Sequence, residues 1–282
     1  MTRTLTPAPA RPDLPSVSIS RTDVITGAFH AFATMLLRDI VVTGRQLGSF
    51  AAQVLIQPFF MLFVFGYVLS AMGFVAPDFA QVLLPGIVAL SGFLTSLQGT
   101  ASPLVVDFSW SREIEDRLLA PAPVAVVALG KVVFGALRGF VAAVVMIPIG
   151  LLMLDSVNWN LAAWPITAGL LALGCLSGAS LGLAMGTLVS PNHIQLAFSL
   201  ILTPLMFTGC TQFPWHGLET LRWYQVLCAL NPLTYLSEGM RAHLSPTRIP
   251  SIPLWVDVLC LLLSIVLAGA VGIWAFARRA KD

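Results

Sequence analysis

Long stretches without a charged residue constrain this chain more than any other feature of its sequence. Residues 46–77, 79–106 and 156–218 contain no Asp, Glu, Lys or Arg. A helix needs about 20 apolar residues to cross the roughly 30 Å of hydrocarbon in a bilayer. Only 10% of the 282 residues are charged and 57% are hydrophobic, whereas soluble domains carry about 25% charged residues. The sequence therefore predicts an integral membrane protein that crosses the bilayer several times.

The spans are expected to be helices, because backbone groups that face lipid must be hydrogen-bonded within their own segment. The charge-free run at 156–218 is long enough for two spans, and Pro191-Asn192 is a turn signal that divides it. The predicted fold class is all-α, a polytopic protein with six transmembrane helices at 50–72, 82–106, 132–154, 161–189, 194–213 and 254–277.

Lys and Arg residues predict the orientation of these spans. If both termini are cytosolic, 11 of the 15 Lys and Arg residues fall on the inner side. Arg222, Arg241 and Arg248 fall outside, and Arg138 lies within the third span. Cytoplasmic loops carry the excess of positive charge in membrane proteins. We therefore expect both termini in the cytosol.

The domain organisation follows from these spans. Residues 1–22 are predicted to be a disordered cytosolic tail, because the first 19 contain four prolines and no apolar core of a signal peptide. Residues 23–46 are predicted to form an amphipathic interfacial helix, and a helix packed on a partner protein is the alternative. Residues 47–282 form the six-span domain, with a cytosolic loop at 107–131 and an external segment at 214–253.

The cytosolic loop concentrates charge in an otherwise nearly uncharged chain. Six charged residues fall between Asp107 and Arg117, and two leucines follow. A solvated connector is one interpretation, but a connector needs only a few residues. We favour an element that docks on another protein, formed by Arg112, Glu113, Glu115, Asp116, Arg117, Leu118 and Leu119.

Small residues at regular spacing mark a second candidate site, for helix packing. Four glycines form one stripe along the fourth span and would allow a neighbouring helix to approach closely: Gly174, Gly178, Gly182 and Gly186. In the external segment, Glu219 with Arg222 and Glu238 with Arg241 have the i, i+3 spacing of helical ion pairs. Cys210 and Cys228 flank part of this segment, which leaves a disulfide open. We expect no metal site, because no Cys or His has zinc-ligand spacing.

Three motifs together resemble the ABC type-2 exporter permeases. The first is the charged run from Arg112 to Pro123, followed by Leu129-Gly130-Lys131, which is similar to the family's cytosolic loop. The second is Asn231-Pro232-Leu233-Thr234-Tyr235 with Arg241, which resembles the motif before the family's last span. The third is the stretch from Thr208-Gly209 to Phe213-Pro214.

The resemblance implies a permease subunit that exports a substrate across the bacterial plasma membrane. Such a permease forms a homodimer and is driven by two copies of an ABC ATPase, which would contact the 23–46 helix and the charged loop. Asn231, Pro232, Tyr235 and Arg241 would belong to an external gate with re-entrant half-helices. Similar proteins export drugs, as in daunorubicin resistance, or polysaccharides and lipo-oligosaccharides, so the substrate would be amphipathic or lipid-linked.

Cofactors and rival functions follow from what the sequence lacks. There is no GxxxxGK[ST] phosphate loop, so ATP and Mg²⁺ are expected on a partner chain, with no cofactor or catalytic residue here. The net charge of +2 indicates no nucleic-acid partner. A channel or ion-coupled carrier remains an alternative, although such carriers bury ionisable groups within their spans. An intramembrane serine protease using Ser180 and His193 is a remote one.

Overall fold

The computed structural model describes residues 55–75, 79–106, 124–154, 159–245 and 250–279. Within these ranges the chain forms helices and turns without a strand, which confirms the all-α fold class for this part of the chain. The elements are Leu55–Ala71 (with the π-helical η1 at Leu62–Val68 and α3 at Leu69–Ala71), α4 Phe79–Val106, α6 Val124–Met153, η3 Leu161–Ala163, α7 Trp164–Leu188, η4 Pro191–His193, α8 Ile194–Thr208, η5 Trp215–Leu218, α9 Arg222–Ala229, α10 Pro232–Leu244 and α11 Leu254–Arg279.

Four of these helices, α4, α6, α7 and α11, are long and apolar enough to cross a membrane. They coincide with the predicted spans at 82–106, 132–154, 161–189 and 254–277. The other two predicted spans coincide with shorter apolar helices, Leu55–Ala71 and Ile194–Thr208. A 15-residue helix such as α8 is only about 22 Å long, short of a bilayer's hydrocarbon thickness.

Two helix boundaries differ from the predicted spans for local reasons. Helix α8 ends at Thr208 rather than 213, because the chain turns at Gly209 and Cys210, and Cys210 has a left-handed φ of 49°. Helix α6 begins at Val124 rather than 132. The predicted span begins after the charged Lys131, whereas the helix includes that residue.

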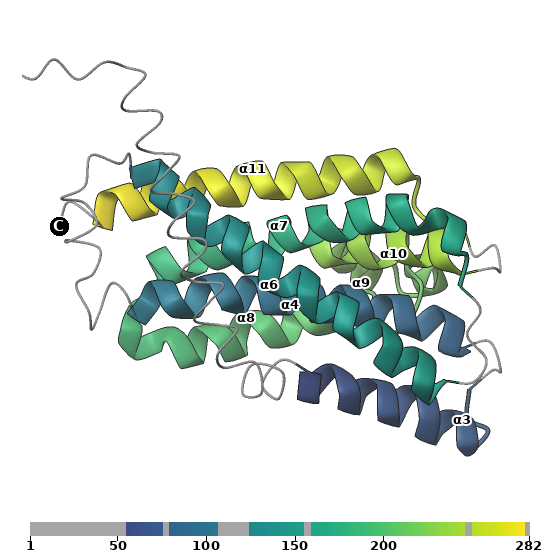
Figure 1. Ribbon diagram of the computed structural model, residues 1–282. Coiled ribbons are helices and arrows are strands. Elements are labelled where there is room, and N and C mark those ends of the chain that lie inside the picture. The colour runs from purple at the N-terminus through teal and green to yellow at the C-terminus, as the bar shows by residue number, and fades with distance from the viewer. Residues whose placement is uncertain (1–54, 76–78, 107–123, 155–158, 246–249, 280–282) are drawn as a thin grey trace, which may run out of the picture.

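Helix α4 lies at the centre of the structure. It packs against both α6 and α7, and α11 packs on α7. In the most apolar 18-residue stretch of each helix, 94% of α4 is buried inside the protein, compared with 22% of α11. The long helices lie side by side, and α9 and α10 occupy the end where α4 begins (Figure 1).

Glycines allow the central helices to approach one another closely. A methyl group added at Gly178 would lie 2.6 Å from the Phe93 carbonyl oxygen of α4, and one added at Gly182 would lie 2.3 Å from that of Leu97. Where α4 meets α6, a methyl group at Gly139 would lie 2.3 Å from the Gly92 carbonyl oxygen. Side chains at these positions would separate the helices.

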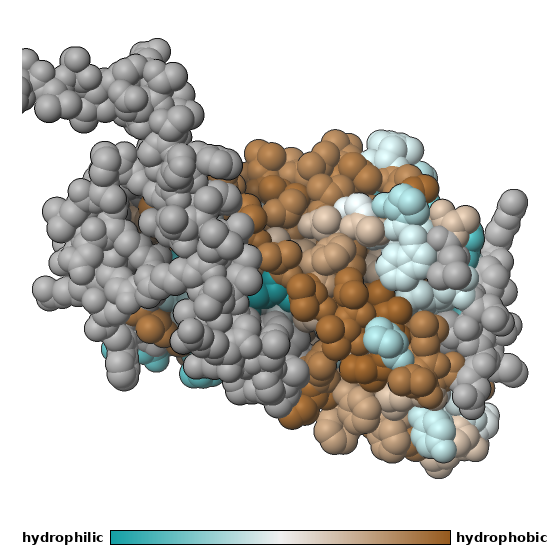
Figure 2. All heavy atoms as spheres, in the orientation of Figure 1, coloured by the Kyte–Doolittle hydropathy of each residue, from teal (hydrophilic) through white to brown (hydrophobic). Residues whose placement is uncertain are grey.

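The outer surface is apolar along the helices, as a lipid environment requires. Figure 2 shows hydrophobic residues over α11 and over the side of the helices that faces the viewer. On α11, Leu259, Val266 and Trp274 each expose more than half of their surface. Water would reject an apolar surface of this extent, whereas lipid accepts it.

Candidate functional site

The charged element predicted to dock on another protein, Arg112–Leu119, and the predicted helix at 23–46 lie outside the described residues. Their roles stay predictions. The described helices that flank the charged element are α4, which ends at Val106, and α6, which begins at Val124. Both ends lie at the same end of the structure as the last turn of α11 (Figure 1).

The second candidate site lies at the opposite end, around α10. This 13-residue helix is polar by sequence, yet nine of its residues are buried. It packs against α4, α7 and α11. The glycine stripe of α7 reaches it, since a methyl group at Gly174 would lie 2.3 Å from the Leu236 side chain of α10. Gly186, at the other end of the stripe, faces Ala101 of α4.

Asn231 connects the start of α10 to the end of α8. Its side-chain oxygen accepts the backbone N–H of Leu233 at 3.0 Å, which caps α10, and Pro232 follows at a position where helices tolerate proline. Its side-chain nitrogen donates to the Leu205 carbonyl at 2.7 Å and to the Thr208 hydroxyl at 2.9 Å. One side chain thus satisfies backbone groups at two helix ends.

Hydroxyl groups of α10 extend this connection. The Thr234 hydroxyl bonds to the carbonyls of Thr208 (3.0 Å) and Cys228 (2.7 Å). The Ser237 hydroxyl donates to the Gly209 carbonyl at 2.8 Å, and the Tyr235 hydroxyl donates to the Ala229 carbonyl at 2.7 Å. The last carbonyls of α8 and α9 are therefore held by side chains of α10.

Among the described residues, Arg241 is the largest side chain that is fully buried. Its Nε donates to the Val82 carbonyl in the first turn of α4 at 3.0 Å, and its Nη2 donates to the Cys210 carbonyl at 2.9 Å. Its Nη1 pairs with Oε1 of Glu238, which also accepts the backbone N–H of Trp215 at 3.0 Å. Arg241 thus joins α10 to α4 and to the turn after α8.

The Glu238–Arg241 ion pair confirms one of the two helical pairs expected from sequence spacing. The other is wrong: Glu219 and Arg222 are both exposed and form no ion pair, because Arg222 begins α9 while Glu219 precedes it in a separate turn. Burial raises the pKa of the Glu238 carboxyl above its ordinary value, and Arg241 opposes this shift. A buried pair of this kind is costly to break, since either partner alone would be an uncompensated charge.

Asp257 adds a third ionisable group at this corner. It lies in the first turn of α11, and its side chain is fully buried. Neither of its carboxyl oxygens has a hydrogen-bond partner among the described residues. A methyl group at Gly239 of α10 would lie 3.0 Å from Oδ2, so α10 and α11 meet at this carboxyl.

Chemistry at other candidate positions is limited in the part of the chain that the structure describes. Cys210 and Cys228 are both free and buried. No group of three His, Cys, Asp or Glu residues there could hold a metal ion. Ser180 donates to the Leu176 carbonyl of its own helix at 2.8 Å, and His193 pairs with Ser190. The catalytic pair that a serine protease would need is not formed.

Most of the contacts around α10 have no signal in the sequence. Those of Ser237, the Trp215 N–H and the Val82 carbonyl each join a side chain of α10 to a main-chain group of a distant segment, and no motif marks such a pair. Tyr235 and Arg241 of the family-like motif lie within α10, and Asn231 caps the start of this helix; their role in an external gate stays a prediction.

Comparisons with known proteins support one assignment. A family described as "ABC-2 type transporter" matches residues 30–244, a range that includes the charged loop and ends at the last residue of α10. The inner membrane transport permease YadH of Escherichia coli K12 is 28% identical over 166 residues, which cover 58% of this chain and 62% of YadH, less than two thirds of its length. Nodulation protein J of Sinorhizobium fredii is 26% identical over 214 residues, or 73% of this chain and 78% of that protein.

Proposed function

This chain belongs to the ABC-2 type transporter family, and we propose that it is the transmembrane permease subunit of an ATP-driven exporter of amphipathic or lipid-linked molecules. The observation that carries the proposal is the family match across residues 30–244, most of the chain. Membership in this family indicates a transport component in a membrane, and the four long apolar helices agree with that role.

A separate chain would supply the ATPase. The 282 residues contain no GxxxxGK[ST] loop, the common cradle for nucleotide phosphates. We place two ATPase copies against a homodimer of this permease, with Arg112–Leu119 and the 23–46 helix as contacts. The density of charge between Asp107 and Arg117 supports this placement, because lipid-embedded segments do not tolerate it.

The topology that fits this function has six spans and cytosolic termini. The Lys and Arg distribution supports it. Helices Leu55–Ala71 and α8, although short, are apolar and lie alongside the four long ones. In this topology α9 and α10 form the external re-entrant segment, and the ends of α4 and α11 near the charged loop face the cytosol.

Helix α4 suits the transmission of force from the ATPase to the external end. At 28 residues it is about 42 Å long. One end leads directly into the charged loop, and the other is held by Arg241 through the Val82 carbonyl. We infer that a pull on the loop moves α4 and α10 together, since a buried, hydrogen-bonded pair resists separation.

We infer the substrate class from the apolar surface of the spans. Their walls are apolar, and few ionisable groups lie along them, which favours an amphipathic or lipid-linked molecule such as a drug, a polysaccharide on a lipid carrier or a glycolipid. A carrier or channel without an ATPase is the alternative. Buried Asp257 and Arg241 are the groups such a carrier would use.

Co-purification tests the proposal. The chain is expressed with an ABC ATPase from the same genome and captured by a tag on the permease. We expect the ATPase to elute with it, and to be lost when Glu113 and Glu115 are both changed to Ala. Glu219→Ala is the control, because Glu219 is exposed and shortly precedes α9, which lies at the opposite end of the structure (Figure 1). Equal capture by both variants would refute the docking role of the loop.

A further inference from the structure

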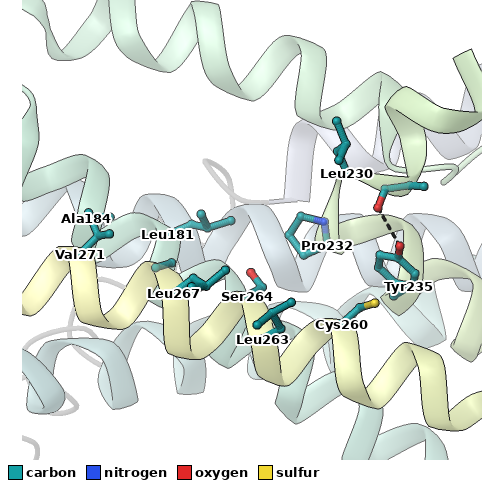
Figure 3. A pocket seen from close by; sticks show the side chains of 12 residues that line it. Leu181, Ala184, Leu230, Pro232, Tyr235, Cys260, Leu263, Ser264, Leu267 and Val271 are labelled. Carbon is teal, nitrogen blue, oxygen red and sulfur yellow. Dashed lines mark hydrogen bonds between the residues drawn. The ribbon is translucent and has the colours of Figure 1, made fainter. Parts of the chain in front are cut away.

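The seam between α7 and α11 contains an apolar groove that the proposed export function does not use. Its volume is about 630 Å³. In Figure 3, Leu181 of α7 and Leu263 and Leu267 of α11 line its length, and Leu230 and Pro232 close it at the α10 end. The two hydroxyls among its described lining residues are engaged: Tyr235 donates to the Ala229 carbonyl, and Ser264 pairs with Ser177 at 2.8 Å. The groove therefore offers contacts to an apolar ligand.

A basic pocket continues the same seam. It has a volume of about 330 Å³ and lies between Thr187 and Ser190 at the end of α7 and the last two turns of α11. Arg279 donates to the carbonyls of Thr187 (3.2 Å) and Val189 (3.3 Å), which fixes its guanidinium at the C-terminal end of α7. Arg278 is exposed, and its guanidinium lies 5.8 Å from the centre of the Trp274 ring.

The two pockets are separated by about one helical turn. Ala184 and Val271 line the apolar groove, whereas Thr187 and Trp274, three residues further along each helix, line the basic pocket. Ten residues separate Arg278 from Ala268, a distance of about 15 Å along the helix. That distance is about half of the hydrocarbon thickness, the depth that one leaflet occupies. A chain that starts at the arginines would therefore enter the groove before it reaches the middle of the bilayer.

We propose that this seam is a binding site for one anionic phospholipid, with its phosphate at Arg278 and Arg279 and one acyl chain in the groove. Three features select this ligand. The apolar groove lies along helices that are long enough to span a membrane, so lipid reaches it directly. The two guanidiniums complement a phosphate. Trp274 lies beside Arg278, as aromatic residues do at the level of lipid headgroups.

Alternative occupants fit less well. A helix from a second copy would bring no negative charge to the arginines from its apolar surface. A substrate anchored by a lipid chain would share the acyl chemistry, but it must leave the site during transport, whereas a membrane phospholipid need not. The site is therefore assigned to a membrane phospholipid.

Native mass spectrometry of the purified full chain in mild detergent tests this site, with phosphatidylglycerol or phosphatidylcholine added. We expect retention of phosphatidylglycerol at a several-fold lower lipid concentration than phosphatidylcholine. Arg278→Gln should weaken phosphatidylglycerol binding about fivefold, the effect of one basic residue on an anionic lipid near a membrane surface. It should weaken phosphatidylcholine binding less, because that lipid carries a phosphate but no net charge. Val271→Trp, which fills the groove from an exposed position, should reduce the retention of both lipids.

Two matched variants make the test specific. Arg222→Gln removes an exposed arginine at the other end of the protein, and Val266→Trp adds the same bulk to an exposed position of α11 outside the groove. Both should bind lipid as the unaltered chain does, and all four variants should elute as single symmetric peaks. Equal retention of the two lipids by the unaltered chain, or equal losses in a variant and its matched control, would overturn the proposal.

Discussion

Replacing Arg241 by Ala should destabilise the protein more than any other single change of a charged residue in the part of the chain that the structure describes. The guanidinium is buried and holds four partners: the carbonyls of Val82, Cys210 and Thr211 and the Glu238 carboxylate. Without it, Glu238 keeps the Trp215 N–H but loses its counter-charge. Breaking a buried pair in this way costs about 3–5 kcal/mol.

That cost converts into a measurable change of melting temperature in detergent. For domains of 150–250 residues, about 1 kcal/mol lowers the melting temperature by roughly 2–4 °C, so Arg241→Ala should lower it by about 10 °C. The double variant Glu238→Gln/Arg241→Met should recover part of this loss, because it removes both charges and keeps an acceptor for Trp215. The carbonyls of Val82, Cys210 and Thr211 still lose the bonds that Arg241 donates, so recovery should be incomplete.

Fluorescence-detected size-exclusion chromatography after heating measures these shifts. Arg222→Ala is the control, because this arginine is exposed at the start of α9 and should change the melting temperature by less than about 2 °C. The reasoning would be refuted if Arg241→Ala melted with the control, or if the double variant melted no higher than Arg241→Ala alone.

Three further stability changes follow from the described contacts, each measured by the same assay. Gly182→Ala should lower the melting temperature by several degrees, because its methyl group would lie 2.3 Å from the Leu97 carbonyl oxygen. Gly169→Ala, with no atom within 4 Å of the new methyl group, should be neutral or stabilising. Equal effects of the two changes would contradict the close packing of α4 and α7. Asn231→Ala should cost about 2 kcal/mol, since it removes a helix cap and two donated bonds, and Asn231→Asp should recover only the cap; full recovery by Asp would show that the donated bonds contribute nothing. Asp257→Asn should leave the melting temperature unchanged or raise it, because it removes a buried charge that has no hydrogen bond at nearly constant volume; a large fall would mean that the carboxylate is paired.

The long helices were predictable because their signal is local. The charge-free runs at 79–106 and 156–218 contain the whole of α4 and α7. Helices α6 and α11 include charged residues but are apolar over most of their length, because a helix in a bilayer faces lipid or neighbouring helices. The helix ends were less predictable. The end of α8 depends on the left-handed turn at Cys210, and cysteine carries no signal for that conformation.

Packing partners were the least predictable part. The stripe from Gly174 to Gly186 was visible in the sequence, but its partners, α4 along most of its length and α10 at one end, were not. At the second close approach, Gly135 and Gly139 lie one turn apart on α6 and meet α4 at Thr100 and Gly92, and this shorter pair does not stand out as a stripe in the sequence. Around α10, Asn231 and Arg241 were found through a family motif, whereas the carbonyl groups they hold come from α4 and α8 and have no sequence signature.

The composition of α10 alone would predict an exposed helix, but the helix is buried. A helix that contains Glu238, Arg241 and His243 reads as an exposed segment. Its polar side chains instead satisfy the carbonyl groups that α8 and α9 leave at their ends. Polar residues can therefore line the interior here because each meets a main-chain partner.

The central claim, that a partner ATPase drives this permease, is tested most directly by ATP hydrolysis in proteoliposomes. The purified complex of the chain and its ABC ATPase is reconstituted, and vanadate-sensitive hydrolysis is compared between the unaltered permease and the Glu113→Ala/Glu115→Ala variant. We predict hydrolysis that requires the permease and falls in the variant. A chain that purifies without an ATPase, and that alone dissipates an ion gradient across the liposome membrane, would contradict the claim and favour a channel or an ion-coupled carrier.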